Sequence, residues 1–79
     1  MITTEQIRAA RAILRITVAE LSIASGVGVA TIKRLEAGSG VPSVHTRTLD
    51  QIYQALTRSG VEFIGSPEDR PGVRLNSSK

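Results

Sequence analysis

Cysteine and tryptophan are absent from this chain of 79 residues, which contains one phenylalanine, one tyrosine and one histidine. The lack of cysteine excludes disulfides, thiolate zinc sites and cysteine nucleophiles, and a single imidazole leaves a metal ion short of nitrogen ligands. We therefore expect neither a metal nor a cofactor. Because aromatic residues make up 3% of the chain, its core must be built from isoleucine, leucine, valine and alanine.

The chain also has no long apolar run. No segment approaches the ~20 consecutive apolar residues that span a bilayer. The first 16 residues include Glu5 and three arginines, where a secretory signal would be apolar. We therefore expect a cytoplasmic protein that does not bind membranes.

A chain of this length has room for one small domain and for little else. Its hydrophobic share of 41% and charged share of 22% are typical of a globular protein. Ser43, His45 and Asp50 could be combined into a catalytic triad by residue type alone. So small a domain cannot also supply an oxyanion hole and a water-excluding pocket, and we expect no catalytic residues and no enzymatic activity.

Positive charge is concentrated in the amino-terminal half. Ten lysines and arginines against seven acids give a net charge of +3, and between residues 8 and 34 the only acid is Glu20. The basic residues in that segment are Arg8, Arg11, Arg15, Lys33 and Arg34. This distribution favours an anionic partner, although Arg8 and Arg15 could equally be solvated side chains on a helix.

Two helices are predicted before residue 26. The first runs over about 4–15 with Thr4 as its N-cap, and the second runs from an N-cap at Thr17 to about residue 25, with Glu20 at the capping-box position. Gly26 is expected to end the second helix in the left-handed conformation. The apolar spacing predicts as inward residues Ile7, Ala10 and Leu14 in the first helix and Leu21 and Ala24 in the second.

Two more helices are predicted before residue 61. A short third helix over about 29–37 places Ile32 and Leu35 inward and leaves Thr31, Lys33 and Arg34 facing outward. The fourth helix begins somewhere between residues 43 and 48, since Ser43 and Thr48 both offer caps, and stops at Gly60. Its expected buried residues are Leu49, Ile52 and Leu56.

The pattern changes from helix to strand after residue 60. The β-prone segments 61–64 and 72–75 are separated by a turn-rich loop of about seven residues, which predicts a hairpin or two separately paired strands. We therefore divide the chain into a helical domain over 1–60, a strand extension over 61–75 that mediates dimerisation, and a disordered tail over 76–79. The expected dimerisation residues are Val61, Phe63, Ile64, Val73 and Leu75.

Two short helices joined by a tight glycine turn, the second with outward basic and small residues, are typical of a helix-turn-helix. The segment TVAELSIASGVGVATIKRLEAG, residues 17–38, resembles the lambda-repressor-like, Cro and XRE family of helix-turn-helix regulators. The resemblance covers about residues 5–59, and it implies a mainly α fold of four or five helices, followed here by the short hairpin or paired strands. Its landmarks are Ile7, Arg8 and Arg11, then Ala19-Glu20-Leu21, then Ala24, Gly26 and Val27, then Thr31-Ile32, Arg34-Leu35-Glu36 and Gly38, then Pro42-Ser43, and finally Thr48-Leu49, Ile52 and Ala55-Leu56.

The resemblance also implies which residues meet DNA. In such regulators the start of the third helix contacts base edges, which here means Gly28, Val29, Ala30, Lys33 and Arg34. Arg34 is the leading candidate because a guanidinium can bond guanine O6 and N7 together. The implied phosphate contacts are Arg15, Thr17, Thr31, His45 and Arg47.

Two further positions matter for this resemblance. The family pairs an arginine and a glutamate at the positions of Arg11 and Glu36, so we expect the same ion pair here. Val18 and Gly28 depart from the family, in which many members have glutamine at the first of these positions and serine or threonine at the second.

The resemblance and the charge together predict a sequence-specific DNA-binding transcriptional regulator. We expect a repressor, because so short a chain has no space for a separate effector domain. A homodimer is expected because a palindromic operator presents two half-sites about 34 Å apart. The alternative is an antitoxin or anti-activator that acts mainly by binding another protein.

Overall fold

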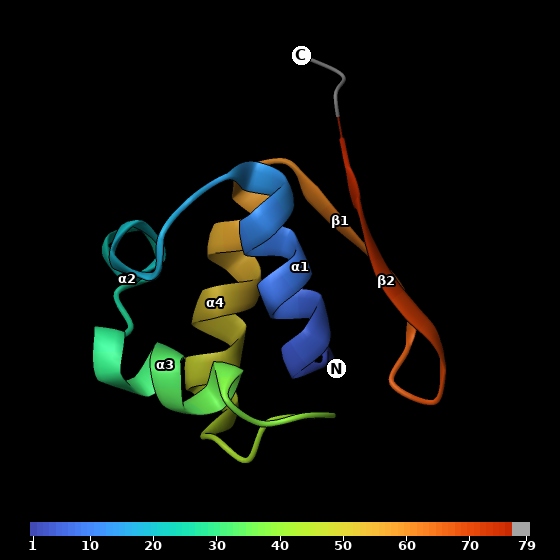
Figure 1. The fold of residues 1–79 in the computed structure, drawn as a ribbon, viewed down its shortest axis with the longest axis horizontal. Helices are drawn as coiled ribbons and strands as arrows, with labels where there is room; N and C mark the ends of the chain where they lie inside the picture. The colour runs from blue at the N-terminus through green and yellow to red at the C-terminus, as the bar shows by residue number, and fades with distance from the viewer. Residues whose placement is uncertain (77–79) are drawn as a thin grey trace.

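A computed structural model describes residues 1–76, which form four helices and one antiparallel hairpin (Figure 1). The mainly α architecture with a carboxyl-terminal hairpin, predicted from the sequence, is confirmed. The elements are α1 (Thr4–Leu14), α2 (Val18–Ser25), α3 (Val29–Glu36), α4 (Thr46–Arg58), β1 (Val61–Ser66) and β2 (Asp69–Leu75).

The helix α1 starts where predicted, but its N-cap lies one residue earlier than expected. Its N-cap is Thr3, whose hydroxyl accepts from the Gln6 N–H at 3.1 Å while the Thr3 N–H donates to the Gln6 side chain at 2.8 Å. The predicted cap, Thr4, was wrong because this reciprocal arrangement needs a glutamate or glutamine three residues later, and Thr4 has Ile7 there. Thr4 is instead buried.

The helix α2 has the predicted ends. Thr17 and Glu20 form the capping box, with bonds of 2.8 and 3.0 Å, and Gly26 ends the helix at a φ of 78°. Ala24, however, is exposed, and the prediction that it faces inward was wrong. Leu21 and Ser25 occupy the buried face, because residues four apart lie on one side of a helix.

The helix α4 uses neither of the predicted caps. His45 is its N-cap, and the His45 Nδ1 accepts from the Arg47 N–H at 3.3 Å. The helix ends at Arg58, with Ser59 as its C-cap and Gly60 following.

The core is aliphatic, as the composition predicts, and all four helices contribute to it. The predicted inward residues of α3 and α4 are confirmed as buried, and Leu14 lies only partly buried at the edge. The largest fully buried apolar side chains are Ile7, Leu21, Ile32, Ile52 and Leu56. Phe63 and Tyr53 pack against each other, with ring centroids 5.2 Å apart.

The hairpin has a much shorter connection than predicted. Its strands extend to Ser66 and from Asp69, so residues 67–68 connect them instead of a seven-residue loop. A bulge at Gly65 allows this tight reversal. Gly65 has a φ of 76°, and an added Cβ there would lie 2.2 Å from the Arg70 carbonyl oxygen, so only glycine fits.

The hairpin packs along α1, on the opposite side from α2 and α3 (Figure 1). The Gln6 Nε2 group reaches both strands, donating to the Ile64 oxygen at 3.1 Å and the Gly72 oxygen at 2.9 Å. Val61 is 3% exposed and belongs to the core. The Asn76 N–H donates to the Gly60 oxygen at 2.6 Å, and the rest of the predicted tail lies outside the described residues.

None of the helices in residues 1–76 has the length and hydropathy needed to cross a bilayer.

Candidate nucleic-acid interface

The helix α3 presents two cations to solvent. Ile32 and Leu35 are buried at 0% and 4% exposure, whereas Lys33 and Arg34 are exposed. Within residues 1–76 neither cation takes part in an ion pair or a side-chain hydrogen bond. Arg34 also borders an open hollow of about 330 Å³, whose other lining residues include Gly38, Ser39 and Pro42.

The amino-terminal end of α3 has small or apolar residues and no side-chain cap. Gly28 is its N-cap, Val29 is 38% exposed and Ala30 is exposed. No side chain caps this end, and its first turn contains no acid. A ligand with negative charge can therefore approach the first backbone N–H groups without meeting a competing carboxylate.

The predicted phosphate contacts lie on three segments: the corner between α1 and α2, α3 itself and the start of α4. Arg15 and Thr17 are exposed at the corner between α1 and α2, where Arg15 adopts a φ of 60°. His45 and Arg47 are exposed at the start of α4. Thr31 is half-buried on α3 itself. The exposed groups therefore come directly before α2 and at the start of α4.

The two positions that depart from the family pattern have different surroundings. Val18 is partly buried and packs against the core, so an apolar side chain is stabilised there. Gly28 is exposed, and a Cβ added to it would have no atom within 4 Å. The neighbourhood of Gly28 is therefore open space rather than a close contact that requires glycine.

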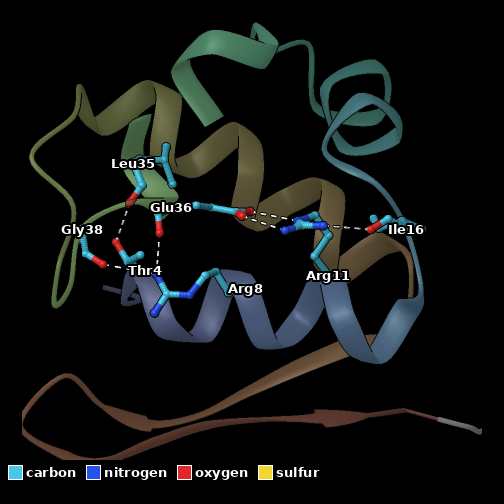
Figure 2. Close-up of polar contacts among 7 residues, drawn as sticks. All are labelled: Thr4, Arg8, Arg11, Ile16, Leu35, Glu36 and Gly38. Carbon is cyan, nitrogen blue, oxygen red and sulfur yellow. Dashed lines mark hydrogen bonds and ion pairs between the residues drawn. The ribbon is translucent and has the colours of Figure 1, made fainter. Parts of the chain in front are cut away.

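The expected ion pair between Arg11 and Glu36 is present and joins α1 to the end of α3 (Figure 2). The Arg11 Nε and Nη2 groups donate to the two carboxylate oxygens at 3.0 and 2.8 Å, and Nη1 donates to the Ile16 oxygen at 3.2 Å. The Glu36 side chain is 7% exposed and that of Arg11 is 25% exposed. The hydrogen bond to the Glu36 carboxylate raises the pKa of Arg11.

Arg8 has a structural partner that the sequence analysis missed. Its Nη1 donates to the backbone oxygens of Glu36 and Gly38, and the Thr4 hydroxyl donates to the Leu35 oxygen at 3.0 Å (Figure 2). The detectable pattern is the spacing of Thr4, Arg8 and Arg11, which repeats every three or four residues and so places all three on one face of α1.

The segment after α3 is also bonded to the start of α1. The Thr4 N–H donates to the Gly40 oxygen at 2.8 Å, and the Gly40 N–H donates to the Glu5 carboxylate at 3.1 Å. The pKa of Glu5 is lowered, first by its own backbone N–H and then by that of Gly40. The link between Glu5 and Gly40 therefore favours the ionised carboxylate.

This shift predicts a pH-dependent contribution to stability. Because the folded pKa of Glu5 lies below its ordinary value of 4.5, the contribution is present above that value and is lost as the pH falls through the folded pKa. The thermal midpoints of wild type and Glu5→Gln, measured from about pH 6 to about pH 2, should differ at the upper end and converge at the lower. A constant difference across this range would contradict the prediction.

The expected dimerisation residues do not form one exposed surface. Val61 lies within the core, while Phe63, Ile64 and Val73 are partly buried. Leu75 is 43% exposed. Tyr53 on α4 is 38% exposed and packs against Phe63, so it lies beside the hairpin.

Residues 1–76 contain no group of three histidine, cysteine, aspartate or glutamate side chains placed to hold a metal ion. No family model matches the chain, and a search of curated proteins found no match.

Proposed function

We propose that this protein is a sequence-specific DNA-binding regulator of the lambda-repressor-like helix-turn-helix class, in which α2, the turn at residues 26–28 and α3 form the helix-turn-helix. The outer face of α3 gives this proposal its main support. Its two cations are exposed and unpaired in residues 1–76, while Ile32 and Leu35 hold the opposite face on the core. The major groove of duplex DNA is wide enough to admit an α-helix that exposes one face in this way.

The chemistry of the α3 face supports base recognition. Arg34 can bond guanine O6 and N7 together, and Lys33 can donate to a base or a phosphate. Val29 and Ala30 offer methyl groups that fit against the methyl group of thymine. Gly28 has no side chain, so the backbone at this end of α3 can lie close to the groove.

The flanking polar residues would supply most of the affinity. Phosphate contacts fix the register of a protein on duplex DNA and carry no sequence information. The exposed groups directly before α2 and at the start of α4 suit this role. They are Arg15 and Thr17 in the first group and His45 and Arg47 in the second, with Thr31 on α3 itself.

A homodimer is part of this proposal. The chain extends 31 Å along its longest axis, and the half-sites of a palindromic operator lie about 34 Å apart. One copy therefore presents one α3 to one half-site, and a second copy is needed for the other. The proposed contact is pairing between the hairpins of two copies, in which Leu75 is exposed and Phe63, Ile64 and Val73 are partly buried. Repression by blocking a promoter is the proposed outcome.

The proposal is tested by selecting bound sequences from a random duplex pool and then comparing two variants on the selected duplex. Arg34→Ala should lose about 1–3 kcal/mol of discrimination at one base position. Arg15→Ala should weaken binding to all duplexes alike and lower the slope of log affinity against log salt by about one. Arg70→Ala, near the start of β2 with a side chain 91% exposed, serves as the control for lost charge.

The proposal is rejected if wild type binds the selected duplex no more tightly than a random one at the same salt concentration. It is also rejected if Arg34→Ala and Arg70→Ala give the same base preferences as wild type.

A second candidate function is an antitoxin or anti-activator that binds another protein. It is favoured by exposed apolar side chains away from α3, including Ile23 at 84% exposure, and by a hollow of about 290 Å³ lined by Met1, Leu49 and Tyr53, among others. Co-purification with the product of a neighbouring gene, together with a lack of preference among duplexes, would favour this candidate.

A further inference from the structure

The helix α3 ends differently from the two helices before it. The helices α1 and α2 both end at a residue in the left-handed conformation, Arg15 with a φ of 60° and Gly26 with a φ of 78°. The C-cap of α3 is Ala37, with a φ of −75° and a ψ of −15°, which continues the right-handed path. The left-handed cap that commonly satisfies the last carbonyl oxygens is therefore missing from α3.

The helix α1 supplies partners for those oxygens. The Arg8 guanidinium donates to the Glu36 oxygen and, at 3.2 Å, to the Gly38 oxygen, and the Thr4 hydroxyl donates to the Leu35 oxygen at 3.0 Å. Figure 2 shows Thr4, Arg8 and Arg11 along one side of α1, all directed at the last turn of α3 and the residues after it. A cation at a helix carboxyl terminus is also favoured by the helix dipole.

These bonds constrain a helix that has few other anchors. The helix α3 has eight residues, and its buried apolar side chains are Ile32 and Leu35. Two apolar contacts on a short helix restrain its distance from the core more strongly than its rotation or tilt. Arg11 bonds the side chain of Glu36, whereas Arg8, together with Thr4, bonds backbone oxygens at and just beyond the end of the helix, and such bonds restrain the direction of its axis.

We infer that Arg8 is a positioning residue for base recognition: it orients α3 from behind, through the backbone oxygens of Glu36 and Gly38. This inference rests on the proposed DNA-binding function. It assigns to Arg8 a role in choosing between sequences without any contact with DNA. A small change in the tilt of α3 displaces Lys33 and Arg34 from the base edges, while the flanking phosphate contacts on α1, α2 and α4 stay in place.

The competing role for Arg8 is a phosphate contact, since its side chain is exposed. The two roles predict different measurements. Loss of a phosphate contact weakens binding to every duplex and lowers the salt slope by about one. Loss of a positioning residue lowers the ratio of affinities for the selected and the random duplex, and it leaves the salt slope as it is in a charge-matched control.

The experiment compares Arg8→Gln with Arg70→Gln, because both variants lose one positive charge and Arg70 pairs only with its neighbour Asp69 among residues 1–76. Affinities for the selected and the random duplex are measured at several salt concentrations. In Arg8→Gln the ratio of the two affinities should fall about 5- to 150-fold, the range for the loss of one base contact. In Arg70→Gln this ratio should match that of wild type.

Three results would contradict the inference or the function on which it rests. An unchanged ratio in Arg8→Gln overturns the inference, and so does an equal loss of affinity for both duplexes with a lower salt slope than Arg70→Gln. Wild type without a preference for the selected duplex overturns the proposed function, and the inference with it. If Arg8→Gln does not fold, Arg8→Lys is compared with Arg70→Lys in the same way, because lysine keeps the charge but lacks the planar fork of donors.

Discussion

Leu35→Ala should lower the free energy of unfolding by about 2–5 kcal/mol, the range observed when a buried leucine is truncated. The Leu35 side chain is 4% exposed and is one of the two apolar anchors of α3. Its loss leaves a cavity under a helix that is too short to be stable by itself. Denaturant unfolding followed by circular dichroism measures the change directly.

A matched control for this variant lies on the neighbouring helix. Ile23 is also aliphatic, yet its side chain is 84% exposed on α2. Ile23→Ala should change the free energy of unfolding by no more than about 0.5 kcal/mol. Equal losses in the two variants would mean that the buried face of α3 is assigned incorrectly, and the outward direction of Lys33 and Arg34 would then be wrong too.

Glu36→Ala is expected to cost about 2–3 kcal/mol of stability. Removing one partner of a fully buried ion pair costs about 3–5 kcal/mol, and here the loss is smaller because water reaches the Arg11 guanidinium. Arg11 cannot discharge itself, since arginine stays protonated in proteins. It would keep only its bond to the Ile16 oxygen, at 3.2 Å, among the bonds it makes within residues 1–76.

The double variant Arg11→Met with Glu36→Ala separates the pair from the individual side chains. If the two groups stabilise the protein through each other, the double variant should be more stable than the sum of the single losses predicts, by about 0.5–3 kcal/mol. Additive losses within about 0.3 kcal/mol would show that the ion pair between α1 and α3 carries no coupling energy.

Local patterns predicted those features of the candidate interface that depend on one helix at a time. The spacing of Ile32 and Leu35 was enough to place Lys33 and Arg34 on the outer face, because the period of a helix fixes which residues share a side. The capping box of Thr17 and Glu20 and the left-handed Gly26 likewise depend on neighbours in the sequence. These features locate α2, the turn and α3 to within a residue.

Contacts between distant segments could not be predicted in this way. In the sequence, Arg8 cannot be told from a solvated arginine. Its helical spacing places it on one face with Thr4 and Arg11, but nothing in the sequence shows that its partners are the backbone oxygens of residues 36 and 38. The burial of Val61 likewise depends on the packing of the hairpin against α1, a helix that is distant in the sequence. The hairpin was expected to be a separate extension, yet Gln6 bonds both strands and Val61 enters the core.

The cap of α4 shows a further limit of local reasoning. Ser43 and Thr48 are residue types that usually cap a helix, and either could have served as the N-cap of α4. The chain instead begins α4 at Thr46, so His45 occupies the N-cap position and its imidazole accepts the bond. The path of residues 38–45, which is tied to α1 through Gly40, determines where α4 can start.

The most direct test of the central proposal is methylation interference on the selected duplex. A methyl group on guanine N7 occupies the position at which Arg34 is proposed to donate in the major groove. Wild type should be blocked by methylation at one particular guanine in each half-site, and Arg34→Ala should be insensitive to methylation at that guanine alone. Identical interference patterns for the two proteins would contradict the proposal that the outer face of α3 reads DNA.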